Sequence, residues 1–183
     1  MAIKLFFLLI IVAGVNLLLF QMIGMQLFEA LTILFYKGAP YVTTSGEKLK
    51  TMLKLAALKK SDRVVDLGSG DGRLLFAAAK VVKEVKGFEI NPFVYQKSLK
   101  NWKKYHSEEK NIEIEKKNFM KENLSKYDVV FVFGIDYLMK DLEVKLLEEL
   151  KPGTRVVSNL YQFPNWKVEK NEGEVYLYIK PAE

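Results

Sequence analysis

The apolar residues of this 183-residue chain follow two different patterns. Residues 5–28 contain no charged side chain and are almost entirely hydrophobic. This run is longer than the roughly 20 residues that a helix needs to cross the hydrocarbon core of a bilayer. No small-residue cleavage site of a secretory signal follows it. The pattern therefore predicts one uncleaved transmembrane helix and a partnership with the lipid bilayer.

Beyond residue 38, short apolar runs that are typical of strands alternate with amphipathic segments that are typical of helices. Such alternation predicts an α/β fold with a mostly parallel sheet covered on both faces. The last segment alternates apolar and polar positions, which predicts an antiparallel edge strand at the C-terminus. Strands are expected at 63–67, 85–90, 111–117, 127–133, 154–160 and 172–180, and helices at 72–82, 93–106 and 142–150.

Two domains are expected, an anchor over residues 1–37 and a globular domain over residues 38–183, because no repeat or low-complexity linker interrupts the second part. The globular part should open with a helix, since Thr44 and Glu47 have the spacing of a capping box before apolar positions at helical intervals.

Charge and composition narrow the possible partners. The net charge of +6 lies wholly beyond residue 36, because Lys4 and Glu29 cancel before it. A basic domain suits anionic lipid or nucleic acid, but no aromatic-interleaved basic motif is present, so nucleic acid is not expected as a partner. The absence of cysteine and the single histidine exclude disulfides and a His/Cys metal site, so no metal is expected.

Candidate chemistry begins where the first predicted strand ends. There Asp66 is followed by Gly68, Gly70 and Gly72. Glycines let the backbone turn sharply and approach a ligand closely, and the next helix offers its positive N-terminus to a nucleotide-type ligand. A dinucleotide fingerprint would need a third glycine at the position of Arg73, so that type of site is excluded.

The pattern D-x-G-x-G-x-G resembles the first motif of class I S-adenosylmethionine-dependent methyltransferases. The resemblance implies a Rossmann-like sheet and S-adenosylmethionine as cofactor. Glu89 ends the next predicted strand, where its two oxygens are able to accept both ribose hydroxyls. The alternative is that this acid merely caps the following helix.

The resemblance also implies further contacts with the cofactor. Asn118 stands where the family most often has an acid, and its amide oxygen can accept from the adenine amino group. Phe119 is expected to stack on adenine, with ordinary packing as the alternative. The other positions implied to contact the cofactor are Tyr41, Asp71, Asn91 and Gly134.

The segments GAPYVTTS, DLGSGDGR, EINP, KYDVVFVFG, KLLEELKPGTRVVS and FPNW, in this order over residues 38–166, resemble short, N-terminally anchored protein-lysine methyltransferases. Mitochondrial members of that family modify the ADP/ATP carrier and the ATP synthase c-ring. The resemblance implies a lysine of a membrane protein as substrate. No Arg-rich mitochondrial presequence is evident, so a prokaryotic plasma membrane is the expected location. The lysines that flank the apolar run favour a cytoplasmic position for the catalytic domain.

The methyl acceptor is expected beyond the central strand, because ligands of open α/β sheets lie outside the carboxyl ends of the strands. Asp136 is the candidate that orients the substrate amine, and Tyr137 the candidate wall of the pocket. Asp136 is equally suited to cap the following helix. The aromatics Tyr161, Phe163 and Trp166 are candidates for a substrate channel or for ordinary packing.

Two other functions remain open. One is a methyltransferase for a membrane lipid or a quinone, which an anchor would serve equally well. The other is a non-catalytic adaptor that binds the cofactor. The intact Asp66, Glu89 and glycines count against the adaptor.

Overall fold

The computed structural model describes residues 10–24, 26–27 and 42–182. Its contacts divide the chain into two compact units, Met1–Pro40 and Tyr41–Glu183. Residues 10–24 are helical and exposed throughout. Within the described residues, no helix has both the length and the apolar character needed to cross a bilayer. The anchor expected over 5–28 lies partly outside the described residues, as do the boundary near 38 and the candidate Tyr41, and all three stay predictions.

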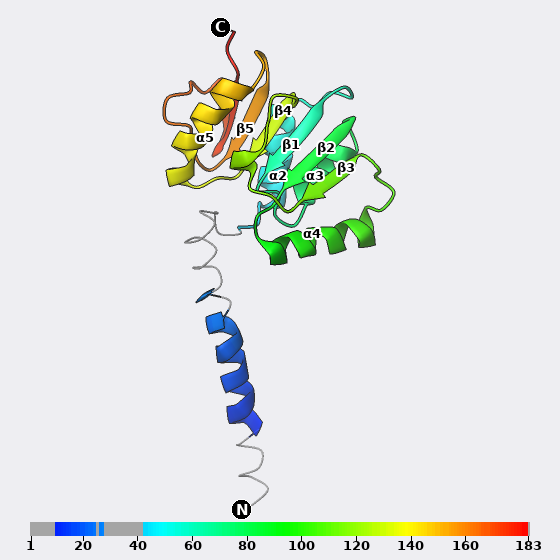
Figure 1. Ribbon diagram of the computed structural model, residues 1–183, viewed down its shortest axis with the longest axis vertical. Helices are drawn as coiled ribbons and strands as arrows, with labels where there is room; N and C mark the ends of the chain where they lie inside the picture. Colours follow the sequence, from blue (N-terminus) through cyan, green and yellow to red (C-terminus); the bar gives the residue numbers. More distant parts are fainter. Residues whose placement is uncertain (1–9, 25, 28–41, 183) are drawn as a thin grey trace, which may run out of the picture. The chain divides into compact units, whose positions relative to one another are not determined.

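The second unit is built on one seven-stranded sheet with the order β3-β2-β1-β4-β5-β7-β6 (Figure 1). Strands β1 to β5 are mutually parallel, and β7 and β6 join them in antiparallel pairs. The mostly parallel sheet predicted from the sequence is therefore confirmed. The strands are β1 Arg63–Leu67, β2 Glu84–Phe88, β3 Ile112–Glu115, β4 Val129–Val132, β5 Arg155–Asn159, β6 Lys170–Glu172 and β7 Val175–Ile179.

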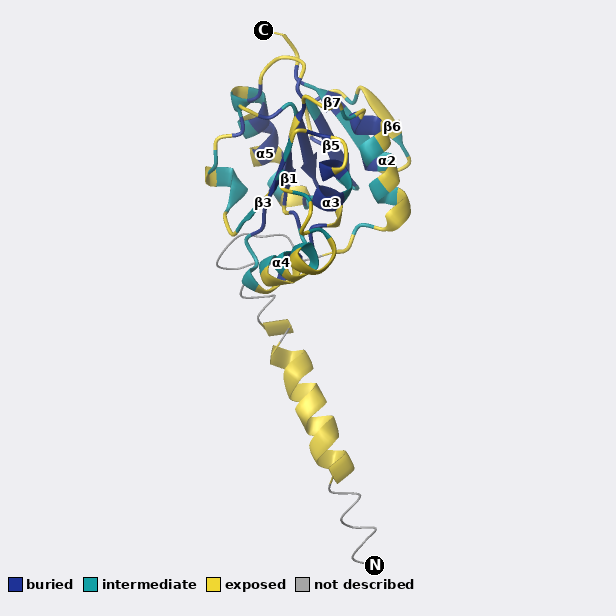
Figure 2. Ribbon diagram, turned by 90° about the vertical axis from the view of Figure 1, so that its right-hand side faces the viewer, coloured by how far each residue is buried: buried dark blue, intermediate teal, exposed yellow. Residues whose placement is uncertain are grey.

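Helices pack on both faces of this sheet (Figure 2). One hydrophobic core joins the sheet to α2 and α3 and includes Trp102 from α4. The other joins the opposite face to α5 and to the segments that follow β3 and β5. Successive strand residues point to opposite faces, so the continuous apolar runs of β1 and β4 fill both cores. The helices are α2 Gly46–Ala56, α3 Arg73–Ala79, α4 Pro92–Tyr105, the 3-10 helix η1 Phe119–Lys121, and α5 Asp136–Glu149.

Two helix starts differ from the sequence-based expectation. The cap of α2 is Ser45, whose hydroxyl accepts a 3.2 Å bond from the backbone N–H of Lys48, so the prediction of Thr44 was wrong by one residue. Helix α5 starts at Asp136 rather than at 142, and its cap residue Ile135 has no capping side chain that would mark this start in the sequence.

The C-terminal strand also differs in its place. The tail forms β7, which is antiparallel as expected but lies between β5 and β6 rather than at the edge. Gly173, with a φ of +56°, makes the turn that folds Lys170–Glu172 back onto β7 as the edge strand. That short polar strand has no hydrophobic alternation, so no sequence pattern indicates it.

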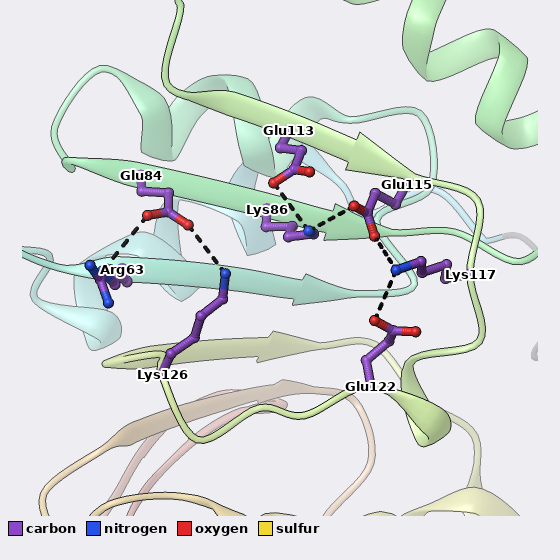
Figure 3. Close-up of polar contacts among 8 residues, drawn as sticks. All are labelled: Arg63, Glu84, Lys86, Glu113, Glu115, Lys117, Glu122 and Lys126. Carbon is purple, nitrogen blue, oxygen red and sulfur yellow. Dashed lines mark hydrogen bonds and ion pairs between the residues drawn. The ribbon is translucent and has the colours of Figure 1, made fainter.

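Charged side chains lie over β1, β2 and β3 beside the second core (Figure 3). Lys86 on β2 pairs with Glu113 at 3.1 Å and with Glu115 at 2.8 Å on β3. Burial alone would lower the pKa of Lys86, but its bonds to the two glutamates outweigh this and raise it, while Lys86 chiefly lowers the pKa of Glu115 to about 2. The connection from β3 to β4 contains only the short η1, so charged side chains rather than a long helix cover this part of the sheet.

Arg155 ties the start of β5 to the end of α2. Its guanidinium pairs with the buried Asp62 at 2.7 Å and donates to the carbonyl oxygens of Ala56 and Ala57, both at 2.6 Å. Ala57 adopts a left-handed conformation with φ +46°, which ends α2 and leaves these carbonyls without helical partners. One side chain therefore satisfies a helix end and a buried carboxylate together.

We expect Arg155→Ala to lower the free energy of unfolding by about 3 kcal/mol, because it leaves the Asp62 carboxylate buried without its counter-charge. Urea unfolding monitored by circular dichroism measures the change. Lys54→Ala is the matched control, since it removes the exposed ion pair of Lys54 with Glu172 and should cost less than about 1 kcal/mol. We call these contacts of Arg155 with Asp62, Ala56 and Ala57 the Arg155 clamp. Equal losses of unfolding free energy in the two variants would contradict its stabilising role.

Candidate active site

The glycine loop leaves the carboxyl end of β1 and is held against the end of β2. The backbone N–H groups of Gly68 and Ser69 both donate to the carbonyl of Phe88, at 2.9 and 3.0 Å. Gly68, Gly70 and Gly72 have φ values of +85°, +58° and +88°, a region that side chains rarely adopt. A Cβ on Gly72 would also lie 2.5 Å from the ring of Phe76. The loop therefore requires glycine for both conformation and space.

Glu89 joins this loop to the turn after β2. Its Oε2 accepts from the backbone N–H of Gly70 at 3.0 Å, and its Oε1 accepts from that of Asn91 at 2.7 Å. Burial raises the pKa of Glu89 above its ordinary value, while the hydrogen bonds from Asn91, Gly70 and Ile90 oppose the rise. A carboxylate has about four acceptor positions, so both oxygens can still accept ligand hydroxyls.

Asp71 and Arg73 hold two further segments against the loop. The Asp71 carboxylate accepts from Nε and Nη2 of Arg73 at 3.0 and 2.8 Å. Nη1 of Arg73 donates to the carbonyl of Thr44 at 2.9 Å, and the Asn101 amide of α4 donates to the Asp71 carbonyl at 3.0 Å. The segment before α2, the glycine loop and α4 are thereby fixed to one another.

These segments enclose an open cleft with about 380 Å³ of empty space, part of it open to solvent. Its floor is Asp66 and the glycine loop, and its walls come from the segment before α2, from α2 and α3, and from the residue after β4. The lining residues are Val42, Thr43, Thr44, Met52, Asp66, Gly68, Ser69, Gly70, Asp71, Arg73, Leu74 and Phe133. The cleft lies at the carboxyl end of β1, where α/β sheets bind ligands.

Electrostatics mark Asp66 as the unusual acid of this cleft. Burial, followed by the negative charges of Glu89 and Asp71, raises the pKa of Asp66 from 3.8 to about 7. A buried carboxylate at the cleft, with the acids Glu89 and Asp71 near it, favours a cationic ligand, whose charge would stabilise the ionised form of Asp66.

Three candidate cofactor residues have structural roles in the fold. The Asn91 side chain caps α4 by accepting from the N–H groups of Phe93 and Val94 at 3.0 and 3.3 Å. Asn118 caps η1 by accepting from the N–H of Met120 at 3.0 Å, and Phe119 packs half-buried against the second core. A cap uses one lone pair of the amide oxygen and leaves the other available to a ligand. Contacts of these three residues with adenine or ribose stay predictions.

The segment after β4 presents its two candidate catalytic side chains at the surface. Asp136 is exposed in the first turn of α5, and Tyr137 is 55% exposed. The cap position belongs to Ile135, so the alternative of Asp136 as helix cap is wrong. Gly134 is buried, and a Cβ there would lie 2.7 Å from Sδ of Met139, so it lets the chain pass close to α5.

The aromatic residues near the C-terminus belong to the core. Phe163 and Trp166 are 3% and 8% exposed and pack with Tyr178 at ring distances of 4.9 and 5.5 Å. The Trp166 indole also donates to the carbonyl of Ile179 at 3.2 Å. Ordinary packing is therefore their role in the structure, and neither they nor Tyr161 lines the cleft described above.

Sequence reasoning missed part of the cleft wall and one polar residue near it. Met52 and Phe133 line the cleft but carry no chemical signal in the sequence. Asn159, at the end of β5, is 1% exposed, and no described residue gives either polar atom of its amide a hydrogen bond. An asparagine at the end of a strand carries no signal in the sequence. Only the packing shows that its amide is buried without a partner.

Comparison with known proteins shows which family the chain resembles. The family model described as the ANTKMT methyltransferase domain matches residues 66–170. A protein-lysine N-methyltransferase of Saccharolobus islandicus is 38% identical over 150 residues, covering 76% of this chain and 92% of that protein. A lysine N-methyltransferase of Xenopus laevis, named for the c-type subunit of ATP synthase, is 34% identical over 136 residues, covering 74% of this chain and only 59% of its own length.

A solved structure is also similar over most of the chain. It is the crystal structure of an RNA methyltransferase from Salinibacter ruber in complex with S-adenosyl-L-homocysteine. It aligns with a TM-score of 0.72 and 31% identity and covers 78% of this chain and 95% of the other.

We expect Asp66→Asn to stabilise the ligand-free protein at neutral and alkaline pH. The folded-state pKa of about 7 exceeds the ordinary value of 3.8, so the folded state binds the extra proton. The contribution of this bound proton to the free energy of unfolding is complete below about pH 4 and is lost as the pH rises through about 7. The advantage of the variant should therefore grow over this window to about 2 to 4 kcal/mol.

Thermal unfolding over a pH series measures this effect. The control is Asp141→Asn on the exposed surface of α5, which should give no such pH-dependent gain. If Asp66→Asn destabilised the protein equally at all pH values, the desolvated carboxylate would not be the source of strain.

Proposed function

The chain belongs to the ANTKMT methyltransferase family, and from this premise we propose that it is a membrane-anchored N-methyltransferase that modifies lysine side chains of a membrane protein. The family match and the similarity to a solved methyltransferase structure with bound S-adenosyl-L-homocysteine establish the class of enzyme and its S-adenosylmethionine cofactor. The chain spans little more than half of the Xenopus relative, so the lysine substrate and the membrane location are part of the proposal.

The single observation that carries the proposal is the link between Glu89 and the glycine loop beside Asp66. A Cβ built on Gly68 meets no atom within 4 Å, so the loop faces open space at the cleft. Ser69 adds a buried hydroxyl without a hydrogen-bond partner among the described residues. These features fit a ligand that brings its own donors to Glu89 and lies against bare backbone.

The residues divide the work of holding the cofactor. Glu89 would accept the ribose hydroxyls, Asn118 and Phe119 would hold adenine, and the glycine loop with Asp66 would face the methionine part. Bound there, S-adenosylmethionine supplies a methyl group on a positively charged sulfur. The ionised Asp66 favours that charge, so cofactor affinity should increase as Asp66 loses its proton.

The acceptor nitrogen must be neutral to attack. A lysine amine has a reference pKa near 10.4, so a desolvated position beside the cleft helps it to lose its proton. We assign Asp136 to orienting the incoming amine as its counter-charge while the amine is still protonated, and Tyr137 to the rim of the entrance. Both are exposed, as groups that meet a macromolecular substrate must be.

Two surface features support a membrane location. Residues 10–24 form an apolar helix whose side chains are exposed, as in a segment that needs a non-aqueous neighbour. Helix α4 carries four lysines and no acidic residue, and its first turn exposes 67% of Phe93. Lysines near anionic headgroups contribute about 1 kcal/mol each. We therefore include α4 as a second contact with anionic lipid.

Two other substrates remain as outcomes of the test. A lipid or quinone acceptor would use the same anchor and cofactor site. RNA is the substrate named for the Salinibacter ruber protein, and the basic surface would suit it. A non-catalytic adaptor is disfavoured, because the charge and geometry of Asp66 and Glu89 are intact.

We expect the full-length protein to transfer labelled methyl groups from S-adenosylmethionine to a protein in membranes of cells that lack its gene. Glu89→Gln should abolish this transfer and weaken cofactor binding at least about tenfold, because it removes a charge-assisted contact and loosens the loop at Gly70. Scintillation counting of separated protein, lipid and RNA fractions measures the transfer, and calorimetry measures the binding.

Each fraction decides a different point. Label on lysine in a protein band supports the proposal and identifies the substrate. Label confined to the lipid extract or to RNA overturns lysine as the acceptor. Unchanged cofactor affinity in Glu89→Gln contradicts the assignment of Glu89, whatever the acceptor.

We expect α4 to sense anionic lipid in the vesicle-bound full-length protein. The chain has no cysteine, so Gln96→Cys on the exposed side of α4 accepts a single environment-sensitive fluorophore. Its emission should shift to the blue on vesicles that contain phosphatidylglycerol and not on pure phosphatidylcholine. Reversing the charge of Lys100, Lys103 and Lys104 to glutamate should abolish the shift, because repulsion replaces attraction.

The matched control reverses three exposed lysines that precede β1 and β2, at the opposite ends of the strands: Lys59, Lys60 and Lys83. An equal loss in this control would show that net charge rather than α4 is responsible. Binding to phosphatidylcholine tests the anchor separately, and its absence would overturn the anchor.

A further inference from the structure

The end of β5 holds an amide that the fold does not use. Asn159 is 1% exposed, and both Oδ1 and Nδ2 are buried without a hydrogen bond to any described residue. Buried polar groups in folded proteins nearly always have partners, and each exception calls for an explanation. An unused acceptor and an unused pair of donors at one position destabilise the ligand-free protein.

The backbone around this amide is strained and firmly held. Leu160 has φ +72°, and the N–H of Tyr161 donates to the carbonyl of Asn159 at 3.0 Å, which makes a three-residue γ-turn. The N–H of Leu160 donates to the carbonyl of Glu174 at 2.7 Å, and the Ser158 hydroxyl donates to the carbonyl of Tyr161 at 2.5 Å. Strain that is held in place by surrounding bonds is typical of functional positions.

The sheet places Asn159 next to the cleft. Ser158 pairs with Val132, so the next residues of the two parallel strands, Asn159 and Phe133, lie side by side at the carboxyl edge. Phe133 lines the cleft.

The alternation of side chains along a strand puts Asn159 on the same face of the sheet as Asp66, which forms the floor of the cleft. Val157, Phe131 and Val64 all belong to the first core, and each lies two residues before Asn159, Phe133 and Asp66 respectively. Residues two apart on a strand share a face, so Asn159 and Asp66 are on the same face of the sheet.

We propose that Asn159 binds the methyl-accepting amine, with Oδ1 accepting one of its N–H groups and Nδ2 donating to a carbonyl oxygen of the substrate. This inference rests on the lysine methyltransferase activity proposed above. A lysine carries its amine at the tip of a slender four-carbon stem, which suits a recessed amide. The bond would fill the vacant hydrogen-bonding capacity of Asn159.

The chemistry favours an amide over an acid at this place. The lone pair of the neutral amine forms the bond to the methyl carbon, and the electron pair of the broken carbon–sulfur bond stays on sulfur. The methylated ammonium then releases a proton to solvent. A neutral carboxamide orients the N–H without stabilising the ammonium form, whereas a carboxylate would raise the pKa of the amine.

The test compares Asn159→Leu and Asn159→Asp with the unchanged full-length protein in the membrane-labelling assay. Asn159→Leu should lower kcat/KM for the acceptor by about tenfold or more, with S-adenosylmethionine affinity unchanged within about twofold. It should keep or increase the thermal stability, since it removes the unpartnered atoms. Asn159→Asp should shift the acid limb of the pH profile of kcat/KM to higher pH by about one unit or more.

The matched control is Thr154→Val, just before the other end of β5. Its buried hydroxyl is already satisfied by the carbonyl of Tyr127 at 3.4 Å, so this variant should lose stability and keep its kcat/KM and pH profile. If Asn159→Leu fails to fold, the pH profile of Asn159→Asp decides alone.

The outcomes separate the inference from the proposed function. Unchanged kcat/KM in Asn159→Leu, or an unshifted pH profile in Asn159→Asp, overturns the inference and leaves the lysine methyltransferase standing. Label that appears in lipid or RNA overturns the lysine substrate and this inference with it. Absence of transfer by the unchanged protein overturns both.

Discussion

The hydrogen bond from Gly70 to Glu89 is the contact on which the site depends. It joins a loop that requires glycine to the turn that starts α4, and it uses the carboxylate that we assign to the cofactor ribose. Arg73 then ties that loop to the segment before α2. The cleft is thus assembled from segments distant in sequence by a few charge-assisted bonds, in addition to the apolar packing of α2 and α3 against the sheet.

These bonds explain why the site is costly to the fold. Asp66 and Glu89 lose hydration and lie near another acid, and Asn159 loses its partners altogether. The stabilising groups lie elsewhere, in the two hydrophobic cores and in the Arg155 clamp. Such a division, with strain at the ligand and compensation in the scaffold, is typical of enzymes.

The sequence predicted the parallel sheet and the glycine loop because each has a strong local signal. Buried parallel strands read as continuous apolar runs, and Gly68, Gly70 and Gly72 stand where only glycine fits. It could not predict β6, which lacks hydrophobic alternation, or the true start of α5, which has no capping side chain. The aromatic pair Phe163 and Trp166 shows the same limit, since aromatic side chains suit a core and a channel equally well until their packing is known.

The charged face over β1, β2 and β3 has a consequence for heat tolerance. The cost of dehydrating ions falls as the temperature rises, whereas hydrophobic stabilisation reaches a plateau. The network centred on Lys86 and Glu115 therefore contributes relatively more in a warm cell than in a cold one. Linked ion pairs cover part of this sheet where another helix would otherwise be needed. They favour stability at high temperature without making the chain longer.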